Sequence, residues 1–354
     1  RATVTISSYT TYIAGLVASA SCNSTGTTTA DLAHVVLEDC ANYSSLTLTV
    51  NKTNPTFGPL VNSFSNSNGR NYGDITFVRC ANYGDVTINT STQLGGILGS
   101  TGNGSPVHMY DCVNYGNLNC TSANKPAGGL VGSLGYILNT EDVFFGCANC
   151  GNITGDVIGG FVGQASANAS YKSSFWRFVS CLQKGVLTAS GGDRIVGEMV
   201  AKFSTASFPY QVEFAGLLTQ SEDLYGFLAT GASLKDLIIE GNMLASGSEG
   251  LVDGTDVATL NAFRECDLWK QGSTGPILKC MPDEPDPDTI TVRFVDAEEF
   301  ESAVLKTCVI LRGWTPVAPA IPEHEGATFV GWNPESFTEL QEIIERVEQK
   351  ERMG

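Results

Sequence analysis

The chain has 354 residues, 42% of them hydrophobic, so it is long and apolar enough to bury the core of one or more folded units. The formal net charge is −17, and most of the excess acid lies after residue 200, where 26 acidic residues face 11 basic ones. Such a charge would repel nucleic acid. Because no run of about 18 apolar residues occurs, the sequence also argues against a membrane-spanning segment.

From about residue 10 to residue 200 the chain repeats a phrase of the form Cys-x-Asn-x-Gly. The copies begin at Cys40, Cys80, Cys112, Cys147 and, degenerately, Cys181, and they lie 32 to 40 residues apart. A period of this length is typical of stacked supersecondary units. Each copy reads as strand, tight turn and strand, with Asn and Gly supplying the positive φ of the turn.

A second phrase, Gly-Gly followed by two apolar residues and Gly, recurs at residues 95–99, 128–132 and 159–163, and a weaker copy occupies residues 194–197. Glycines around aliphatic residues suit a short buried strand that a neighbouring backbone approaches closely. Two phrases in a fixed order predict a mainly β fold. We expect a β-solenoid, in which each repeat forms one rung and pairs with the copies above and below it.

Stacked rungs place equivalent residues in columns along the axis, so the five repeat cysteines should form a ladder of small buried side chains. Rungs about 4.8 Å apart also bring Cα atoms within disulfide range, which leaves pairing inside the ladder as an alternative. Two other pairs are better disulfide candidates. Cys120 and Cys150 depart from the repeated pattern and would lie near each other on consecutive rungs, and Cys266 and Cys280 are 14 residues apart.

Tyrosine follows the repeat asparagine in three copies, at Tyr43, Tyr83 and Tyr115. On successive rungs these rings would stack into a half-exposed stripe. The stripe would stabilise the rungs, and an exposed stripe would also present faces that bind glycans.

Eight sequons of the form Asn-x-Ser/Thr occur in the first half of the chain and none after residue 168. They are candidate glycosylation sites. The acceptor residues are Asn23, Asn42, Asn51, Asn89, Asn103, Asn119, Asn152 and Asn168. Together with eleven cysteines, which suit an oxidising compartment, they predict a secreted or cell-surface glycoprotein.

The two phrases together resemble the GLUG-type repeats of bacterial and protist surface proteins, adhesins among them, over about residues 10–200. The repeat spacing becomes irregular over residues 201–281, and the later part of this segment is similar to the closing stretch that ends such arrays. A cap is expected there, because the edge of a terminal rung would otherwise template aggregation. The resemblance implies a structural or adhesive role, with surface or matrix glycoproteins as partners.

Three further segments follow the array. Residues 282–288 form an acidic proline-rich linker that should be stiff. Residues 289–334 resemble the short β-grasp-like repeat of listerial and Bacteroides surface proteins, most clearly at residues 326–332. Residues 335–354 carry apolar side chains at helical spacing, which predicts a C-terminal amphipathic helix.

The chain offers little catalytic chemistry. Its only histidines, His34, His108 and His324, lack metal-ligand spacing, and no nucleotide or hydrolase motif occurs, so we expect no metal, no cofactor and no enzymatic activity. The alternative is a carbohydrate-active enzyme, a lyase or glycoside hydrolase on a β-helix, which needs two carboxyls across a cleft. Its candidate acids lie beside predicted turns, where Asp is locally favoured. They are Asp74, Asp85, Asp111, Glu141, Asp142 and Asp156.

Residues 2–6 alternate like a strand ahead of the first repeat phrase, and the module after Cys280 follows a stiff linker. An apolar strand at one end and an open rung or small β-module at the other are complementary by strand addition. Contacts of this kind do not close and would give head-to-tail filaments. Self-association is therefore the second expected mode of interaction.

Overall fold

The computed structural model divides the chain into two compact units, residues 1–283 and 284–354. The residues that the structure describes are 2–6, 15–22, 33–50, 56–66, 73–88, 92–121, 123–137, 140–166, 175–204, 210–231, 233–240, 243–244, 257–258, 260–261, 267–272, 275–281, 289–295 and 304–311.

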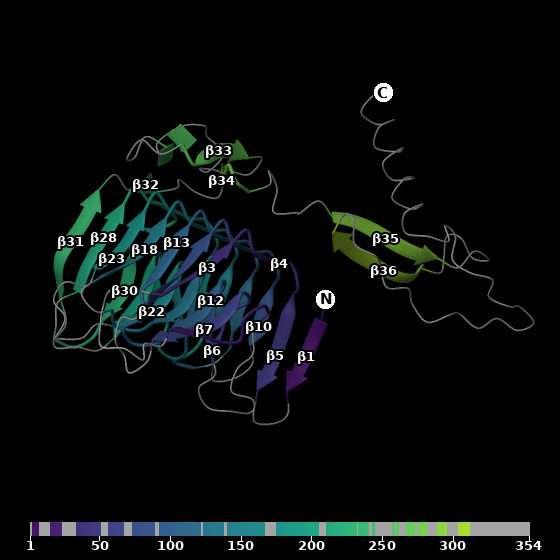
Figure 1. The fold of residues 1–354 in the computed structure, drawn as a ribbon, viewed down its shortest axis with the longest axis horizontal. Coiled ribbons are helices and arrows are strands. Elements are labelled where there is room, and N and C mark those ends of the chain that lie inside the picture. The colour runs from purple at the N-terminus through teal and green to yellow at the C-terminus, as the bar shows by residue number, and fades with distance from the viewer. Residues whose placement is uncertain are drawn as a thin grey trace, which may run out of the picture. The chain divides into compact units, whose positions relative to one another are not determined.

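The first unit is a parallel β-solenoid, as the repeats predict (Figure 1). The chain visits five sheets in a fixed order, which we number 1 to 5, and each complete turn adds one short strand to each sheet. Every strand pairs in parallel with its counterparts in the neighbouring turns. In the view of Figure 1, β1 (Ala2–Ile6) and β31 (Leu234–Glu240) lie at opposite ends of the stack.

The sheets contain five to seven strands each. In spatial order, sheet 1 contains β1, β5 (Leu46–Val50), β10 (Val86–Ile88), β15 (Leu118–Cys120), β20 (Ile153–Gly155) and β25 (Leu187–Ala189). Sheet 2 contains β6 (Thr56–Phe57), β11 (Gln93–Gly95), β16 (Pro126–Gly128), β21 (Val157–Gly159) and β26 (Ile195–Gly197). Sheet 3 contains β2 (Ala20–Cys22), β7 (Val61–Asn66), β12 (Leu98–Thr101), β17 (Val131–Leu134), β22 (Val162–Ser166), β27 (Val200–Ser204) and β30 (Tyr225–Leu228).

Sheet 4 contains β3 (Ala33–Glu38), β8 (Gly73–Val78), β13 (Val107–Tyr110), β18 (Glu141–Phe145), β23 (Phe175–Val179), β28 (Tyr210–Ala215) and β31. Sheet 5 contains β4 (Ala41–Asn42), β9 (Ala81–Asn82), β14 (Val113–Asn114), β19 (Ala148–Asn149), β24 (Leu182–Gln183), β29 (Leu218–Thr219) and β32 (Met243–Leu244).

Aromatic and aliphatic side chains fill the space between the sheets. The largest core cluster draws on sheets 3 and 4, where Phe144, Phe178 and Phe214 stack on successive turns with ring centroids 4.9 and 5.4 Å apart. A second cluster lies between sheets 1 and 2 and includes Leu94 and Ile158. Because equivalent positions carry similar side chains in each turn, the buried apolar area grows with every rung that is added.

A left-handed corner joins sheet 4 to sheet 5 in each turn. The residue before each repeat cysteine has a positive φ of 50–62°, and this residue is Asp39, Arg79, Asp111, Gly146 or Ser180. The expectation that the Asn-x-Gly turn supplies the positive φ was therefore wrong. The glycine of that turn is required for close approach instead, because a Cβ at Gly116 would lie 2.0 Å from the carbonyl oxygen of Gly84.

The segment predicted to cap the edge of the terminal rung, which we still call the cap, covers a side of the solenoid instead. Its antiparallel hairpin, β33 (Trp269–Gly272) and β34 (Gly275–Leu278), lies beyond sheet 5 in Figure 1. Trp269 packs with Leu182 and Leu218 of that sheet, and its indole Nε1 donates to Ser180 Oγ at 3.0 Å. The outer edges of β31 and β32, the last strands of sheets 4 and 5, pair with no strand among the described residues.

The second unit contains an antiparallel hairpin of β35 (Thr289–Val295) and β36 (Val304–Leu311). The rest of the predicted β-grasp-like module, the linker at 282–288 and the helix at 335–354 lie outside the described residues.

Candidate functional site

A column of side-chain amides runs through the interior of the solenoid beside sheet 5. Each amide nitrogen, except that of the last member Gln183, donates to the amide oxygen of the next turn at 2.7 to 2.9 Å. It also donates to the backbone carbonyl two residues further along its own chain. The members are Asn42, Asn82, Asn114, Asn149 and Gln183. All are buried, so every amide must find its partners inside the protein.

A column of glycines faces the amides, and it links the two repeated phrases. The second glycine of each Gly-Gly pair lies against an amide, as Gly129 does against Asn149. A Cβ at Gly129 would lie 2.6 Å from Asn149 Cγ and 2.0 Å from the carbonyl oxygen of Gly160 in the next turn. The interior asparagine therefore requires glycine opposite it.

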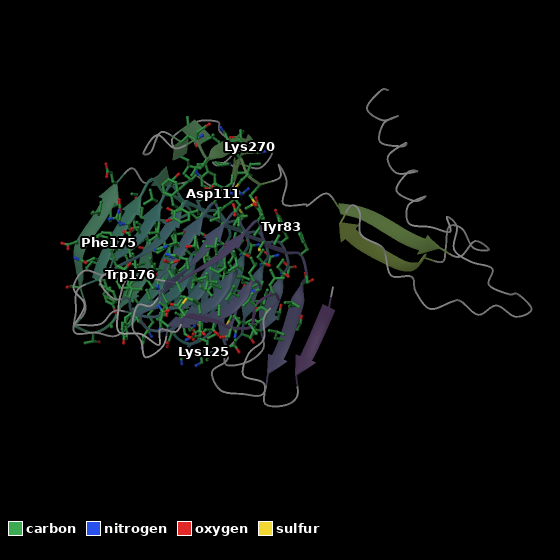
Figure 2. The ribbon with its side chains drawn as sticks, in the orientation of Figure 1. Tyr83, Asp111, Lys125, Phe175, Trp176 and Lys270 are labelled. Atoms are coloured by element: carbon green, nitrogen blue, oxygen red, sulfur yellow. The ribbon has the colours of Figure 1, made fainter. Side chains whose placement is uncertain are left out.

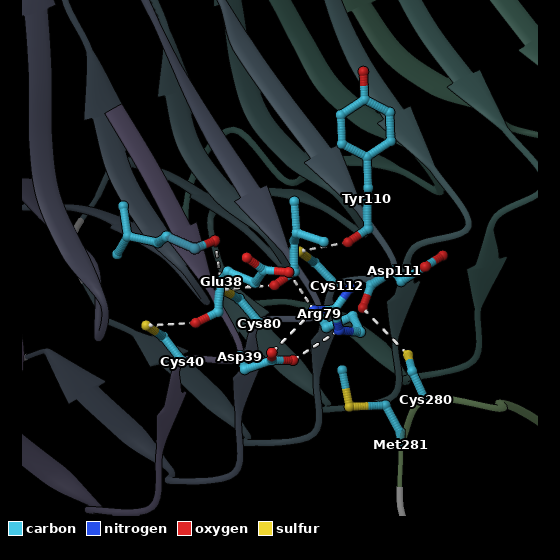
Figure 3. Close-up of polar contacts among 12 residues, drawn as sticks. Glu38, Asp39, Cys40, Arg79, Cys80, Tyr110, Asp111, Cys112, Cys280 and Met281 are labelled. Atoms are coloured by element: carbon cyan, nitrogen blue, oxygen red, sulfur yellow. Dashed lines mark hydrogen bonds and ion pairs between the residues drawn. The ribbon is translucent and has the colours of Figure 1, made fainter. Parts of the chain in front are cut away.

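The repeat cysteines form a third column, which Figure 3 shows at its first members. Cys80 Sγ lies 3.4 and 3.5 Å from the carbonyl oxygens of Leu37 and Val78, either of which can accept its one proton. Cys112 has such a contact with Tyr110, and Cys147 has two. Burial raises the pKa of the Cys112 and Cys147 thiols. These thiols therefore behave as small core side chains with a weak hydrogen bond.

The structure does not bear out the expected disulfides. Cys120 and Cys150 are both free thiols, and they belong to different core clusters, because Cys120 lies on sheet 1 and Cys150 follows sheet 5. The strand register aligns residues at the same position of the turn on consecutive rungs, and these two cysteines occupy different positions. Cys280 is an exposed free thiol whose Sγ lies 3.9 Å from the carbonyl oxygen of Asp111 (Figure 3), and Cys266 lies outside the described residues.

Thiol labelling of the native protein should distinguish the buried cysteines of the column from the exposed Cys280. We expect N-ethylmaleimide to modify Cys280 over hours, slowly because burial raises the pKa of its thiol to about 11. Cys112 and Cys147 should react only in denaturant, since neither is exposed to solvent. Peptide mass spectrometry reads both results. Equal labelling of Cys112 and Cys280 in native buffer would contradict the buried column.

The sequons differ in their access to solvent. Asn103 and Asn152 are exposed and Asn119 is half-buried. Asn42 belongs to the amide column, where its Nδ2 already donates to Ser44 and Asn82, so the folded protein offers no room for a glycan there. Four acceptors lie outside the described residues, namely Asn23, Asn51, Asn89 and Asn168.

The predicted tyrosines stack. Ring centroids of Tyr43 and Tyr83 are 4.8 Å apart, and those of Tyr83 and Tyr115 are 5.1 Å apart, with nearly parallel planes. The cap contributes Met281, whose Sδ accepts from the Tyr83 hydroxyl at 3.9 Å. Burial raises the pKa of Tyr83 and Tyr115, and Tyr43 is 40% exposed. Most of the stripe is thus covered, and its open face is that of Tyr43.

The candidate acids hold neighbouring backbone and side chains in place. Asp156 accepts hydrogen bonds from the backbone amides of Asn124, Asp193 and Arg194, and these bonds lower its pKa. Asp142 is fully buried and accepts from the amide of Val107, and burial raises its pKa to about 8.

The remaining acids lie at strands and corners. Asp85 accepts from the backbone amide of Asn117. Glu141 makes an ion pair with Arg177, and the carboxyl of Asp74 lies within hydrogen-bond distance of His34 Nδ1, at 2.8 Å. Asp111, labelled in Figure 2, is the residue with positive φ at one corner.

A half-open cavity of about 270 Å³ lies near the later turns, and it contains two carboxyls that sequence reasoning missed. Its lining residues are Gly185, Val186, Leu187, Val196, Glu198, Gln220, Ser221 and Asp223.

The cavity arises where the repeat fails. Gly197 pairs with Gly159, so Glu198 takes the glycine-column position that Gly160 holds one turn earlier. On the opposite side the amide column ends, because Thr219 follows Gln183. Glu198 is only 6% exposed, and its Oε2 accepts from the backbone amide of Gln220 at 3.2 Å.

Glu198 was missed because the fourth copy of the Gly-Gly phrase was aligned to the wrong residues. Sequence reasoning placed the weak copy at residues 194–197, whereas the strand register places it at residues 197–201. A glutamate in place of the second glycine was the available signal.

Burial, and secondarily the charge of Asp223, raises the pKa of Glu198 from 4.5 to about 7. The folded state therefore binds this proton more tightly than the unfolded chain. The resulting stability is present below pH 4.5 and is lost as the pH rises through 7. Glu198→Gln should leave the free energy of unfolding unchanged at pH 4 and increase it at pH 8 by up to about 3 kcal/mol. Urea unfolding at both pH values measures this, and a pH-independent difference would contradict it.

No family model, curated protein or solved structure matched the chain in our comparisons. Within the described part of the chain, no helix is long and apolar enough to cross a membrane.

Proposed function

We propose that this protein is a non-catalytic structural or adhesive glycoprotein, secreted or displayed at the cell surface. The observation that carries the proposal is the continuous interior amide column from Asn42 to Gln183, which fixes the register of successive turns. Fully satisfied buried polar networks specify a unique packing. A repeat array built this way serves well as a rigid scaffold that presents its outer surface to a partner.

The placement of the acids supports this role. Asp74, Asp85, Asp142, Asp156 and Glu141 each bind a named backbone amide or side chain, as turn and strand chemistry requires. The resemblance to GLUG-type repeats supports it as well. Exposed Asn103 and Asn152 would carry glycans, and surface or matrix glycoproteins would be the partners.

Glycopeptide analysis of protein isolated from its source, combined with protease treatment of intact cells, tests the proposal. We expect occupancy at Asn103 or Asn152, an unmodified Asn42, and release of fragments from cells that remain sealed. An unmodified chain that proteases reach only after lysis would overturn the proposed location.

Self-association is the second part of the proposal. Open strand edges lie at both ends of the stack, at β1 and β3 in the first turn and at β31 in the last, as far as the described residues extend. Val36 on β3 and Ile239 on β31 are exposed, which suits strand-to-strand contact with a second copy. Light scattering of the full chain and of chains lacking residues 1–8 or 289–354 tests this. The number of copies per particle should fall in at least one truncation, and an association state unchanged in both truncations would leave a monomeric scaffold.

A carbohydrate-active enzyme is the alternative function, and the shared cavity of Glu198 and Asp223 is the observation that favours it. Glycoside hydrolysis needs two carboxyls that flank the bond. Reducing-sugar release from a polysaccharide panel tests this alternative. Turnover that Glu198→Gln abolishes would establish it, and no release by the wild-type protein would eliminate it for those substrates.

A further inference from the structure

We propose that the cavity around Glu198 and Asp223 binds a primary ammonium group, carried by a free alkylamine or by a lysine side chain. This inference does not depend on the proposed function, because the site would serve a scaffold or an adhesin equally. It rests on the hydrogen bonding, charge and size of the cavity.

The carboxyl of Glu198 can accept further hydrogen bonds. Its Oε2 accepts from the backbone amide of Gln220, and its Oε1 accepts no hydrogen bond from the residues that the structure describes. A buried carboxylate is costly unless a donor or a positive charge satisfies it. An ammonium group brings both, since it has three N–H donors and a unit charge.

The rest of the lining favours an organic cation. Asp223 adds a second acid, and none of the lining residues is basic. The apolar side chains of Val186, Leu187 and Val196 supply a wall for an aliphatic stem, the arrangement in which a lysine side chain buries its methylenes.

Size and ligand number favour an ammonium group over a sugar or a metal ion. The cavity of about 270 Å³ falls below the range of about 300–1,000 Å³ typical of sites for drug-sized ligands, so it suits one side chain better than a sugar pair. A calcium ion takes about six to eight oxygen ligands. The described residues contain no group of three or more His, Cys, Asp or Glu side chains suited to a metal ion.

Nuclear magnetic resonance titration of the full chain tests the proposal, with n-butylammonium chloride as the probe at constant ionic strength. We expect saturable shifts of the Gln220 amide and of the Val186, Leu187 and Val196 methyls, with none from n-butanol. Glu198→Gln should weaken binding by about tenfold or more. Glu222→Gln, a matched control, removes the same charge from a residue outside the lining and should leave the affinity unchanged.

The pH supplies an independent readout. Glu198 titrates near 7, and Asp223 is the charged side chain whose field contributes to that pKa. Affinity should fall by about tenfold from pH 8 to pH 6, as the carboxyl takes up a proton that the ammonium would have to displace.

A titration with Nα-acetyl-lysine amide, in which the side-chain ammonium is the only charged group, separates the two sources of the ammonium group. Tighter binding of the capped lysine than of n-butylammonium assigns the site to a partner's lysine, and weaker binding assigns it to free amines. Equal shifts from n-butanol, or full affinity in Glu198→Gln, would overturn the proposal. Shifts from neutral glucose without any from the amine would replace it with a sugar site.

Discussion

Gly129→Ala should destabilise the solenoid by more than about 4 kcal/mol, or prevent folding, while Gly192→Ala leaves it intact. The new methyl group at residue 129 would lie 2.0 Å from the carbonyl oxygen of Gly160 and 2.6 Å from Asn149 Cγ. The first of these is backbone and the second belongs to the amide column, so relief would require two adjacent turns to separate. Thermal and urea unfolding of both variants measure the effect.

Gly192 is the matched control, because a Cβ there would meet no heavy atom within 4 Å. Its replacement by alanine should be neutral or stabilise the protein by about 0.5 kcal/mol, because alanine lowers the conformational entropy of the unfolded chain. If the two variants melt within 2 °C or so of each other, the glycine column does not face the amides as described.

Asn114→Ala is expected to cost about 3 to 5 kcal/mol of unfolding free energy. The asparagine is fully buried, and its amide accepts from Asn82 and donates to Asn149 and to the carbonyl of Gly116. Alanine would leave one donor and two acceptors unsatisfied in the interior, and it would open a small cavity.

Asn117→Ala removes the same amide from the outside of the same turn. Asn117 is exposed. Its Nδ2 donates to Asp85 and its Oδ1 accepts from the backbone amide of Asn152, and water can replace both bonds because they lie at the surface. The control should lose less than about 1 kcal/mol. Comparable losses in Asn114→Ala and Asn117→Ala, measured by urea unfolding, would contradict a buried and fully satisfied column.

The periodic part of the fold could be predicted from the sequence. Cysteine and the Gly-Gly phrase recur because each fills one position of the turn in every rung, so their spacing reveals the stack. The corner geometry could not be predicted, since Asp39, Arg79 and Gly146 share its positive φ but no side-chain chemistry. Two-residue strands such as Ala81–Asn82 are likewise too short to produce an alternating pattern.

The role of the repeat asparagine was misread for a physical reason. Asn before Gly is a common turn signal, and nothing local distinguishes it from an asparagine that faces inward and bonds to its own copies. The cavity was missed because it lies where the period fails, at Glu198. A residue that departs from the repeat, such as Glu198, therefore marks the position of a cavity, whereas the repeat itself indicates the fold.

The stacking of the turns is the central claim, and the distance between Thr87 and Thr188 tests it most directly. These residues are linked through Asn119 and Thr154 by three successive parallel pairings in sheet 1. Spin labels on unnatural amino acids at both positions leave the native thiols untouched. Pulsed electron resonance should give one narrow distribution consistent with a Cα separation of about 14 Å, or three strand spacings, plus the label arms. A broad distribution centred well beyond about 30 Å would contradict the solenoid.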